Sequence, residues 1–229
     1  MKDIVVIGSG GFSKQVIEII EQLNLINQEY KLLGIIDDDK SLVGTEVLGY
    51  EVIGDTNYIK QFSQQNKIHG VIAIADGIVR KEISRKLYDV QWVNLIHPSS
   101  VVSDYTKIGE GNIICAGVVI NPDFQMGDHS HINIGSTLGH DVSMLDYVTI
   151  MPGSRISGNV ILKSNSMVGT GSTIIQGLTI EENVVLGAGA VVTKNTEPNY
   201  LYVGVPAKKK KALTSLDESK ITSLVNSSH

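Results

Sequence analysis

Every sixth residue from Ile96 to Val192 is Ile, Leu, Val or Met, and no step in this series is interrupted. An α-helix repeats every 3.6 residues and a lone strand every two, so neither requires a strict period of six. A β-helix made of hexapeptides does, because each flat face takes six residues and turns one aliphatic side chain inward. The series therefore predicts an all-β, parallel β-helix over residues 96–207, with residues eighteen positions apart stacked on one another.

Two neighbouring positions repeat with the same period. The residue two places before each aliphatic is mostly small or Val, which suits a narrow core with one large and one small side chain per face. The residue directly after the aliphatic is often glycine, and we expect these glycines to occupy tight corners with unusual backbone angles. They are Gly109, Gly127, Gly139, Gly169 and Gly187.

Charge and composition argue against several classes of protein. The net charge is −5 and the one basic run is Lys208–Lys211, so no nucleic-acid partner is expected. No stretch approaches the ~18 apolar residues of a membrane span, and the N-terminal segment resembles a strand more than a signal peptide. Cys115 is the only cysteine, which argues against a disulfide framework or a thiolate metal cluster. We therefore expect a cytoplasmic protein.

Residues 1–95 show the pattern of a small α/β, Rossmann-like domain. An apolar strand at 3–7 runs into a glycine turn and then a helical pattern, which is the opening of a nucleotide-binding βαβ unit. A second strand at 31–36 ends in Asp37 and Asp38, at the strand end where ligands collect in parallel sheets. Glycines are also needed for plain turn geometry, and the acidic run could be a solvated turn. Further elements are expected as helices at 57–65 and 78–87, strands at 70–75 and 91–95, and a β excursion at 43–53.

His140 is the histidine best placed for chemistry. It lies two residues past the inward Leu138, so its side chain should point away from the core. Gly158 lies one coil later, which should bring a backbone N–H close to the imidazole. A base beside a backbone donor suits acyl transfer, in which the base removes a proton and the N–H stabilises an oxyanion. Asp141 or Asp146 could orient the ring; the alternative is an ordinary exposed histidine.

His129 and His131 invite a metal-site interpretation, which the spacing does not favour. Their side chains should stack beneath Tyr147 and Thr149, whereas metal ligands would have to converge from several faces. We therefore expect no metal. The lysines at 208–211 open a C-terminal segment, 208–229, which is either a solvated tail or a cationic site for a phosphorylated cofactor.

Several motifs together resemble one known family over residues 1–210. They are VIGSGGFSKQVIEII, GIIDDD, IHPSSVVS, LGHDV and YVGVPAKK. The chain resembles the bacterial nucleotide-sugar and sialic-acid acetyltransferases of the NeuD/PglD type, which join a small nucleotide-sugar-binding domain to a left-handed β-helix. The resemblance implies a homotrimer, with acetyl-CoA in the groove between neighbouring β-helices and direct transfer from the thioester. It implies that His140 is the base, Asp141 its support and Gly158 the amide facing the thioester oxygen.

The resemblance also assigns binding residues. It implies that Thr149, Thr170 and Ala188 lie along the coenzyme groove. The residues that it places on the acceptor side are Gly10, Gly11, Phe12, Asp37, Asp38, Ala75 and Asn133. Three positions depart from the pattern, because Phe12 and Thr149 stand where some relatives have histidine, and Ala75 replaces a frequent glycine.

The expected function is acetyl-CoA-dependent N-acetylation of a nucleotide-linked 4-amino-4,6-dideoxy-sugar for surface-glycan synthesis. The nearest alternative is O-acetylation of sialic acid or a related sugar. An alternative of another class is a non-catalytic trimer that binds a nucleotide sugar. Zinc-dependent hydration would need a bound metal.

Overall fold

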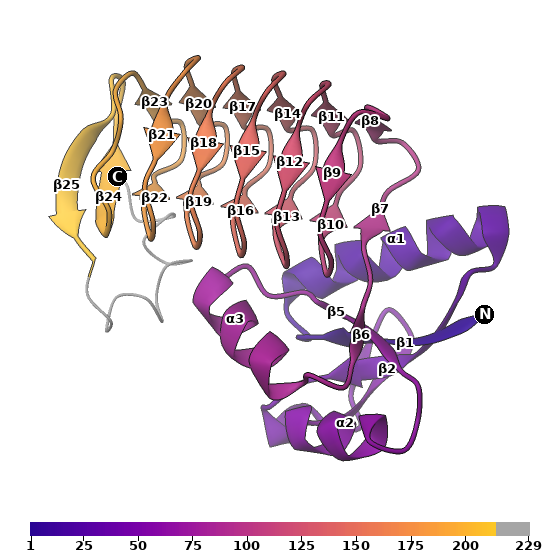
Figure 1. Cartoon of the computed structure of the whole chain (residues 1–229). Helices are drawn as coiled ribbons and strands as arrows, with labels where there is room; N and C mark the ends of the chain where they lie inside the picture. Colours follow the sequence, from indigo (N-terminus) through magenta and orange to yellow (C-terminus); the bar gives the residue numbers. More distant parts are fainter. Residues whose placement is uncertain (214–229) are drawn as a thin grey trace.

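The computed structural model describes residues 1–213, which form a small α/β domain joined to a long β-helix (Figure 1). The α/β domain, called the front domain below, contains a six-stranded sheet in the order β3-β4-β2-β1-β5-β6. Its elements are β1 (Lys2–Ile7), α1 (Gly11–Asn27), β2 (Tyr30–Ile36), the 3₁₀ helix η1 (Lys40–Leu42), β3 (Glu46–Val47), β4 (Tyr50–Gly54), α2 (Thr56–Ser63), β5 (His69–Ile72), α3 (Gly77–Lys86) and β6 (Gln91–Trp92). The predicted α/β order is confirmed, and the expected β excursion is the β3–β4 hairpin.

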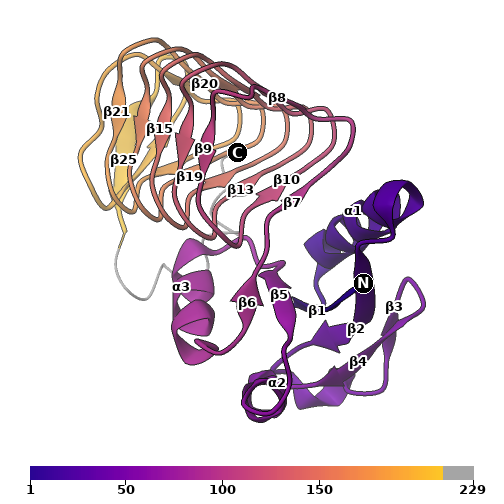
Figure 2. The ribbon, with the colours of Figure 1, turned by 45° about the vertical axis from the view of Figure 1, so that its right-hand side comes forward.

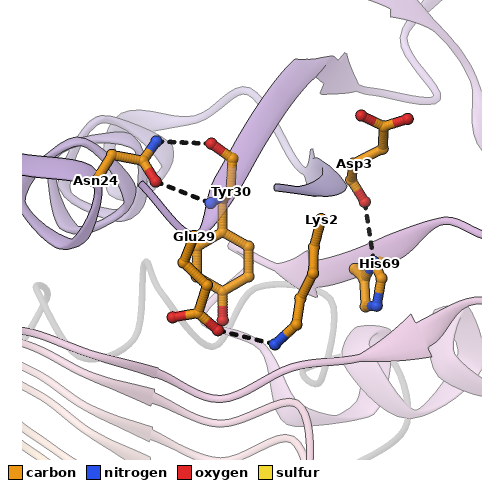
Figure 3. A network of polar contacts seen from close by, with 6 residues as sticks. All are labelled: Lys2, Asp3, Asn24, Glu29, Tyr30 and His69. Atoms are coloured by element: carbon orange, nitrogen blue, oxygen red, sulfur yellow. Dashed lines mark hydrogen bonds and ion pairs between the residues drawn. The ribbon is translucent and has the colours of Figure 1, made fainter. Parts of the chain in front are cut away.

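Helices cover both faces of this sheet. Apolar residues of α1 pack on one face with β1 and β5, and those of α2 and α3 pack on the other. The connection from α1 to β2 is held by the Asn24 side chain, which bonds both the N–H and the carbonyl of Tyr30 (Figure 3). Beside it, Lys2 pairs with Glu29 at 2.8 Å, and a ring nitrogen of His69 contacts the Asp3 carbonyl at 3.1 Å. These contacts lie at the N-terminal ends of β1, β2 and β5, at the opposite end of β1 from the glycine turn.

The β-helix is a triangular prism with three sheets (Figure 2). The domain face, whose first coils the front domain covers, holds β7 (Leu95–Ile96), β10 (Ile113–Ile114), β13 (His131–Ile132), β16 (Thr149–Ile150), β19 (Met167–Val168) and β22 (Val185–Leu186). The second face holds β8 (Val101–Val102), β11 (Val119–Ile120), β14 (Thr137–Leu138), β17 (Arg155–Ile156), β20 (Thr173–Ile174) and β23 (Val191–Val192). The third holds β9 (Lys107–Ile108), β12 (Gln125–Met126), β15 (Ser143–Met144), β18 (Ile161–Leu162) and β21 (Thr179–Ile180).

The predicted β-helix is confirmed in its register and its core. Strands pair in parallel with residues eighteen positions on, as His131 does with Thr149. All the predicted inward aliphatics from Ile96 to Val192 belong to one apolar cluster inside the prism. Four buried serines beside them donate to carbonyls of the next coil, as Ser154 does to Gly169 at 3.0 Å. The buried hydroxyl of Ser166 has no partner in the described chain.

The expected reason for the corner glycines is wrong. Gly109, Gly127, Gly139, Gly169 and Gly187 do not have positive φ angles; the left-handed residues come two positions later, as at Asp141. A Cβ on Gly139 would lie 2.5 Å from the nitrogen of Gly158, in the backbone of the next coil. Glycine is therefore needed at these positions because the coils stack closely, and not because the chain turns sharply.

The C-terminal end closes the prism. Strand β24 (Tyr200–Val203) extends the domain face, and β25 (Lys208–Ala212) pairs with it in antiparallel orientation. The lysines expected to open a tail thus form a strand, in which Lys209 pairs with Glu197 at 2.6 Å and lies over the Tyr200 ring. The rest of the predicted tail, 214–229, lies outside the described residues. Within the described range, no helix is long and apolar enough to cross a membrane.

Candidate active site

His140 lies at the corner between the second and third faces, directly after β14. Its side chain is 57% exposed, and its Nδ1 lies 2.7 Å from a carboxylate oxygen of Asp141. Asp146, the alternative partner, instead accepts the backbone N–H of Asp128. A carboxylate only accepts, so Nδ1 carries the proton and Nε2 is left with a lone pair. The imidazole is therefore oriented as a base that faces solvent.

Gly158 lies directly beneath this imidazole, as the eighteen-residue register predicts. A Cβ at position 158 would lie 2.6 Å from Cε1 and 2.7 Å from Nε2 of His140, so the ring fits only above a glycine. Among the described residues, nothing accepts a hydrogen bond from the Gly158 N–H. A base and an unpaired backbone donor therefore lie together, which is the pair that acyl transfer needs.

Gly158→Ala is expected to lower kcat about 10–100-fold, because the new methyl group displaces the imidazole from its position. Gln176→Ala changes an exposed side chain at the same corner one coil later and serves as the control, with wild-type kcat expected. Steady-state release of CoA thiol measures both variants. A Gly158→Ala enzyme with unchanged kcat would mean that the observed ring position is not the one used in the reaction.

Four other predicted residues meet in a pocket of about 240 Å³ between the front domain and the domain face. The pocket is lined by Phe12, Gln15, Ala75, His131, Asn133, Thr149, Met151 and Pro152. Thr149, expected on the coenzyme side, is buried here and donates its hydroxyl to the Ala75 carbonyl at 2.7 Å. The structure thus places Thr149 with the acceptor-side residues Phe12, Ala75 and Asn133.

Thr170 and Ala188 lie apart from this group but close to its edge. Both are exposed, and they occupy the same corner as Pro152 in successive coils. Backbone bonds from Gly171 to Pro152 and from Gly189 to Thr170 hold this stack in register. The two residues therefore form a ridge that leads away from the pocket along the prism.

The glycine turn and the acidic residues form the outer part of the front domain. A Cβ on Gly10 or Gly11 would meet nothing within 4 Å, so packing inside the chain does not require glycine there. Asp37 accepts bonds from the N–H and hydroxyl of Ser9, at 2.9 and 2.6 Å, which ties the turn to the end of β2. Partial burial raises the pKa of Asp37, but the bonds from Ser9 and Asp39 outweigh it and leave the pKa below its usual value.

Asp38 makes a different contact from Asp37. Its carboxylate accepts the N–H and hydroxyl of Thr56, at 2.8 and 2.7 Å, and so fixes the start of α2. Of the two predicted acidic residues, only Asp37 is bonded to the glycine turn. The structure therefore separates them, with Asp37 at the turn and Asp38 at the neighbouring helix.

His140 and the acceptor-side pocket do not meet within one chain. The pocket lies at the corner after the domain face, near Pro152, and His140 lies at the corner after the second face. The whole width of the second face separates the two corners (Figure 2). A ligand that reached both within one chain would have to cross the second face.

Arg80, on α3, is a key residue that the sequence did not reveal. It is fully buried and donates to the carbonyls of Ile74, Ala75, His129, Tyr147 and Val148 and to the Thr149 hydroxyl, at 2.7 to 3.2 Å. Burial lowers the pKa of Arg80 to about 9, which still leaves the guanidinium charged at neutral pH. Arg80 therefore joins the front domain to the β-helix beside the pocket. In the sequence it looks like one more solvated charge, near Lys81, Arg85 and Lys86.

The two buried histidines, His129 and His131, lie close to Arg80. His129 stacks on Tyr147 at 5.5 Å and meets the edge of Trp92 at 4.9 Å. Burial lowers the pKa of His129 to about 4, and it lowers that of His131 well below the usual value. No group of three metal-ligating side chains occurs among residues 1–213. The predicted stacking beneath Tyr147 and Thr149 is confirmed.

These histidines should make the protein sensitive to mild acid. The unfolded chain takes up protons below about pH 6.5, whereas folded His129 stays neutral down to about pH 4, so stability falls as the pH drops between these values. The expected loss for His129 is about 3 kcal/mol across the whole window, of which about 2 kcal/mol falls between pH 6.5 and pH 5. Urea unfolding at pH 7.5 and pH 5 gives the difference in free energy of unfolding between the two pH values. His129→Leu should reduce this difference. An equal pH dependence in both proteins would contradict the assignment to His129.

Comparison with known proteins agrees with this architecture. Residues 3–87 match the family model described as the PglD N-terminal domain. Over 122 residues the chain is 34% identical to GDP-perosamine N-acetyltransferase of Escherichia coli O157:H7, and over 121 residues 30% identical to UDP-N-acetylbacillosamine N-acetyltransferase of Bacillus subtilis. Each alignment spans 51% of this chain and 52% of the relative, so the chain matches about half the length of these curated relatives.

Solved structures match over nearly the whole length. A histidine-to-asparagine variant of perosamine N-acetyltransferase from Caulobacter crescentus, in complex with CoA and GDP-perosamine, is 34% identical with a TM-score of 0.85. The match covers 92% of this chain and 98% of that one. The acetyltransferase domain of PglB from Neisseria gonorrhoeae, in complex with acetyl coenzyme A, is 29% identical with a TM-score of 0.82, covering 91% and 99% of the two chains.

Proposed function

The chain belongs to the PglD-type family of sugar acetyltransferases, and we propose that it transfers the acetyl group of acetyl-CoA to the amine of a nucleotide-linked 4-amino-4,6-dideoxy-sugar. The observation that carries this proposal is the Asp141-oriented imidazole of His140 above the unpaired N–H of Gly158. The product would be a precursor for surface-glycan synthesis.

The chemistry follows from this geometry. The neutral 4-amine attacks the thioester carbonyl, and Nε2 of His140 removes the ammonium proton as the tetrahedral intermediate forms. The Gly158 N–H stabilises the oxyanion, and Asp141 stabilises the transient imidazolium. When the intermediate collapses, the C–S bond breaks and the CoA sulfur leaves with the proton from His140. The amide remains on the sugar.

Direct transfer is favoured over an acyl-enzyme. Cys115 is the only thiol of the chain, and it is buried between the front domain and the β-helix. Burial raises the pKa of Cys115 to about 12, so it is not a thiolate at neutral pH. The amine of the acceptor is therefore the nucleophile in the proposed reaction.

We further propose that the site lies between copies in a homotrimer. His140 of one copy would face the acceptor pocket of its neighbour, and acetyl-CoA would lie in the groove between them along Thr170 and Ala188. The support is the separation of His140 and the pocket by the whole second face. Light scattering should give the mass of three 24.7 kDa chains.

Mixing two inactive variants tests the shared site. His140→Ala removes the base, and Ala75→Trp fills the acceptor pocket. If the site is shared, oligomers assembled from both variants regain activity, because some sites pair an intact His140 with an intact pocket. If each chain holds a complete site, every mixed oligomer stays inactive.

Activity on a panel of acceptors tests the function itself. The assay measures thiol release from acetyl-CoA with UDP-, dTDP- and GDP-linked 4-amino-sugars, including GDP-perosamine, and with free sialic acid. Turnover of a nucleotide 4-amino-sugar is expected. Turnover of sialic acid alone would favour O-acetylation. Saturable binding of a nucleotide sugar without turnover would favour the non-catalytic trimer.

A further inference from the structure

His131 is buried in the wall of the acceptor pocket without a hydrogen-bond partner. Its exposed fraction is 1%, and neither ring nitrogen makes a hydrogen bond within the described chain. The Ile72 carbonyl is close enough to raise its pKa slightly, but it does not form a bond with the ring. The ring packs against Phe12 at 5.2 Å between centroids. Buried polar side chains are normally paired, so this histidine calls for an explanation.

The buried polar groups around His131 differ in whether they have a partner in the described chain, and the Nδ1 of His129 in the same coil also has none. Arg80 and Thr149, one coil away, are bonded within the chain. On the opposite wall of the pocket, the buried Oε1 of Gln15 has no partner either. Asn133 uses its Oδ1 to accept the Ile134 N–H, which leaves its amide NH₂ without a bond in the described residues. Unused donors and acceptors from α1 and β13 thus converge on one pocket.

The lining defines the chemistry of the occupant. No lining side chain carries a full charge, and Phe12, Met151 and Pro152 supply apolar surface. Such a pocket does not suit a phosphate, but it suits a neutral ring with a few hydroxyl groups and an apolar edge. We propose that His131 determines acceptor specificity by hydrogen-bonding hydroxyl groups of the amino-sugar ring, an inference that rests on the proposed function. A rotation of the imidazole turns a nitrogen into the pocket when the sugar enters.

A neutral imidazole suits this role. Burial and the nearby charge of Arg80 hold the pKa of His131 far below neutrality, so the ring offers one donor and one acceptor. A hydroxyl group can serve as partner to either nitrogen. His131 therefore acts as a positioning contact for the sugar and not as a second base.

Three variants test the proposal. His131→Leu fills similar space without polar atoms, and His131→Gln keeps a donor and an acceptor. His129→Leu is the matched control, because His129 is a buried histidine of the same coil that does not line this pocket. The measurements are kcat and both KM values with GDP-perosamine, the Kd of GDP-perosamine by calorimetry, and the Tm of the free protein.

We expect His131→Leu to lower kcat/KM for the acceptor about 10–100-fold and to raise its Kd. The acetyl-CoA KM should stay within about twofold, the Tm should hold or rise, and His131→Gln should recover part of the affinity. Unchanged kcat/KM and Kd for the acceptor in His131→Leu, or an equal loss of both in His129→Leu, would overturn the proposal. If the wild-type protein neither binds nor acetylates any nucleotide 4-amino-sugar, the proposed function fails, and this inference fails with it.

Discussion

Replacing His140 by alanine is expected to lower kcat by about 10²–10⁴-fold while both substrates still bind. The imidazole is exposed at a corner, so its removal takes away the proton acceptor without opening the apolar core. Steady-state thiol release gives kcat, and calorimetry gives the affinity for acetyl-CoA and for the nucleotide sugar. The comparison requires that chemistry, and not product release, limits turnover.

Asp141→Asn is the variant to compare with His140→Ala, because it should have a smaller effect on kcat. An amide oxygen at position 141 can still accept the Nδ1–H, but it lacks the negative charge that supports the imidazolium. Its loss of kcat should therefore be smaller than that of His140→Ala. A loss below about tenfold in His140→Ala, with chemistry limiting, would show that another group removes the proton.

Replacing Arg80 by leucine is expected to lower the free energy of unfolding by about 3–5 kcal/mol, the largest stability effect of any substitution considered. The variant leaves carbonyls of both domains and the Thr149 hydroxyl without their donor in a buried place. Each unpaired buried group costs on the order of 1–3 kcal/mol, and relaxation recovers part of the sum. Urea unfolding at pH 7.5 measures the change.

Arg85→Leu is the matched control for Arg80→Leu. Arg85 lies on the same helix but is exposed, so its loss should change stability by less than about 0.5 kcal/mol. Arg80→Lys keeps the charge but not the planar guanidinium that bonds both domains. Its loss in free energy of unfolding should therefore lie between those of Arg80→Leu and Arg85→Leu. Equal stability of Arg80→Leu and Arg85→Leu would show that the hydrogen bonds of Arg80 do not stabilise the contact between the two domains.

Much of the β-helix could be predicted from the sequence because its repeat is local and strict. Each inward aliphatic is set by its own hexapeptide, so the spacing of six predicts the faces, the core and the pairing of residues eighteen apart. The position of Gly158 under His140 follows from the same register. The α/β pattern of the front domain was equally clear, because its strands and helices have distinct apolar patterns.

Tertiary structure decided how the two parts meet. Arg80, His131 and Gln15 come together because the front domain packs on the domain face, and no periodicity encodes that contact. The corner glycines also needed the structure, since only the distance to the next coil distinguishes close stacking from a sharp turn. The sequence by itself determined a prism with His140 stacked on Gly158 at one corner. Only the packed chain showed a pocket between the front domain and the domain face, one whole face away from His140, because domain docking depends on surfaces that are distant in sequence.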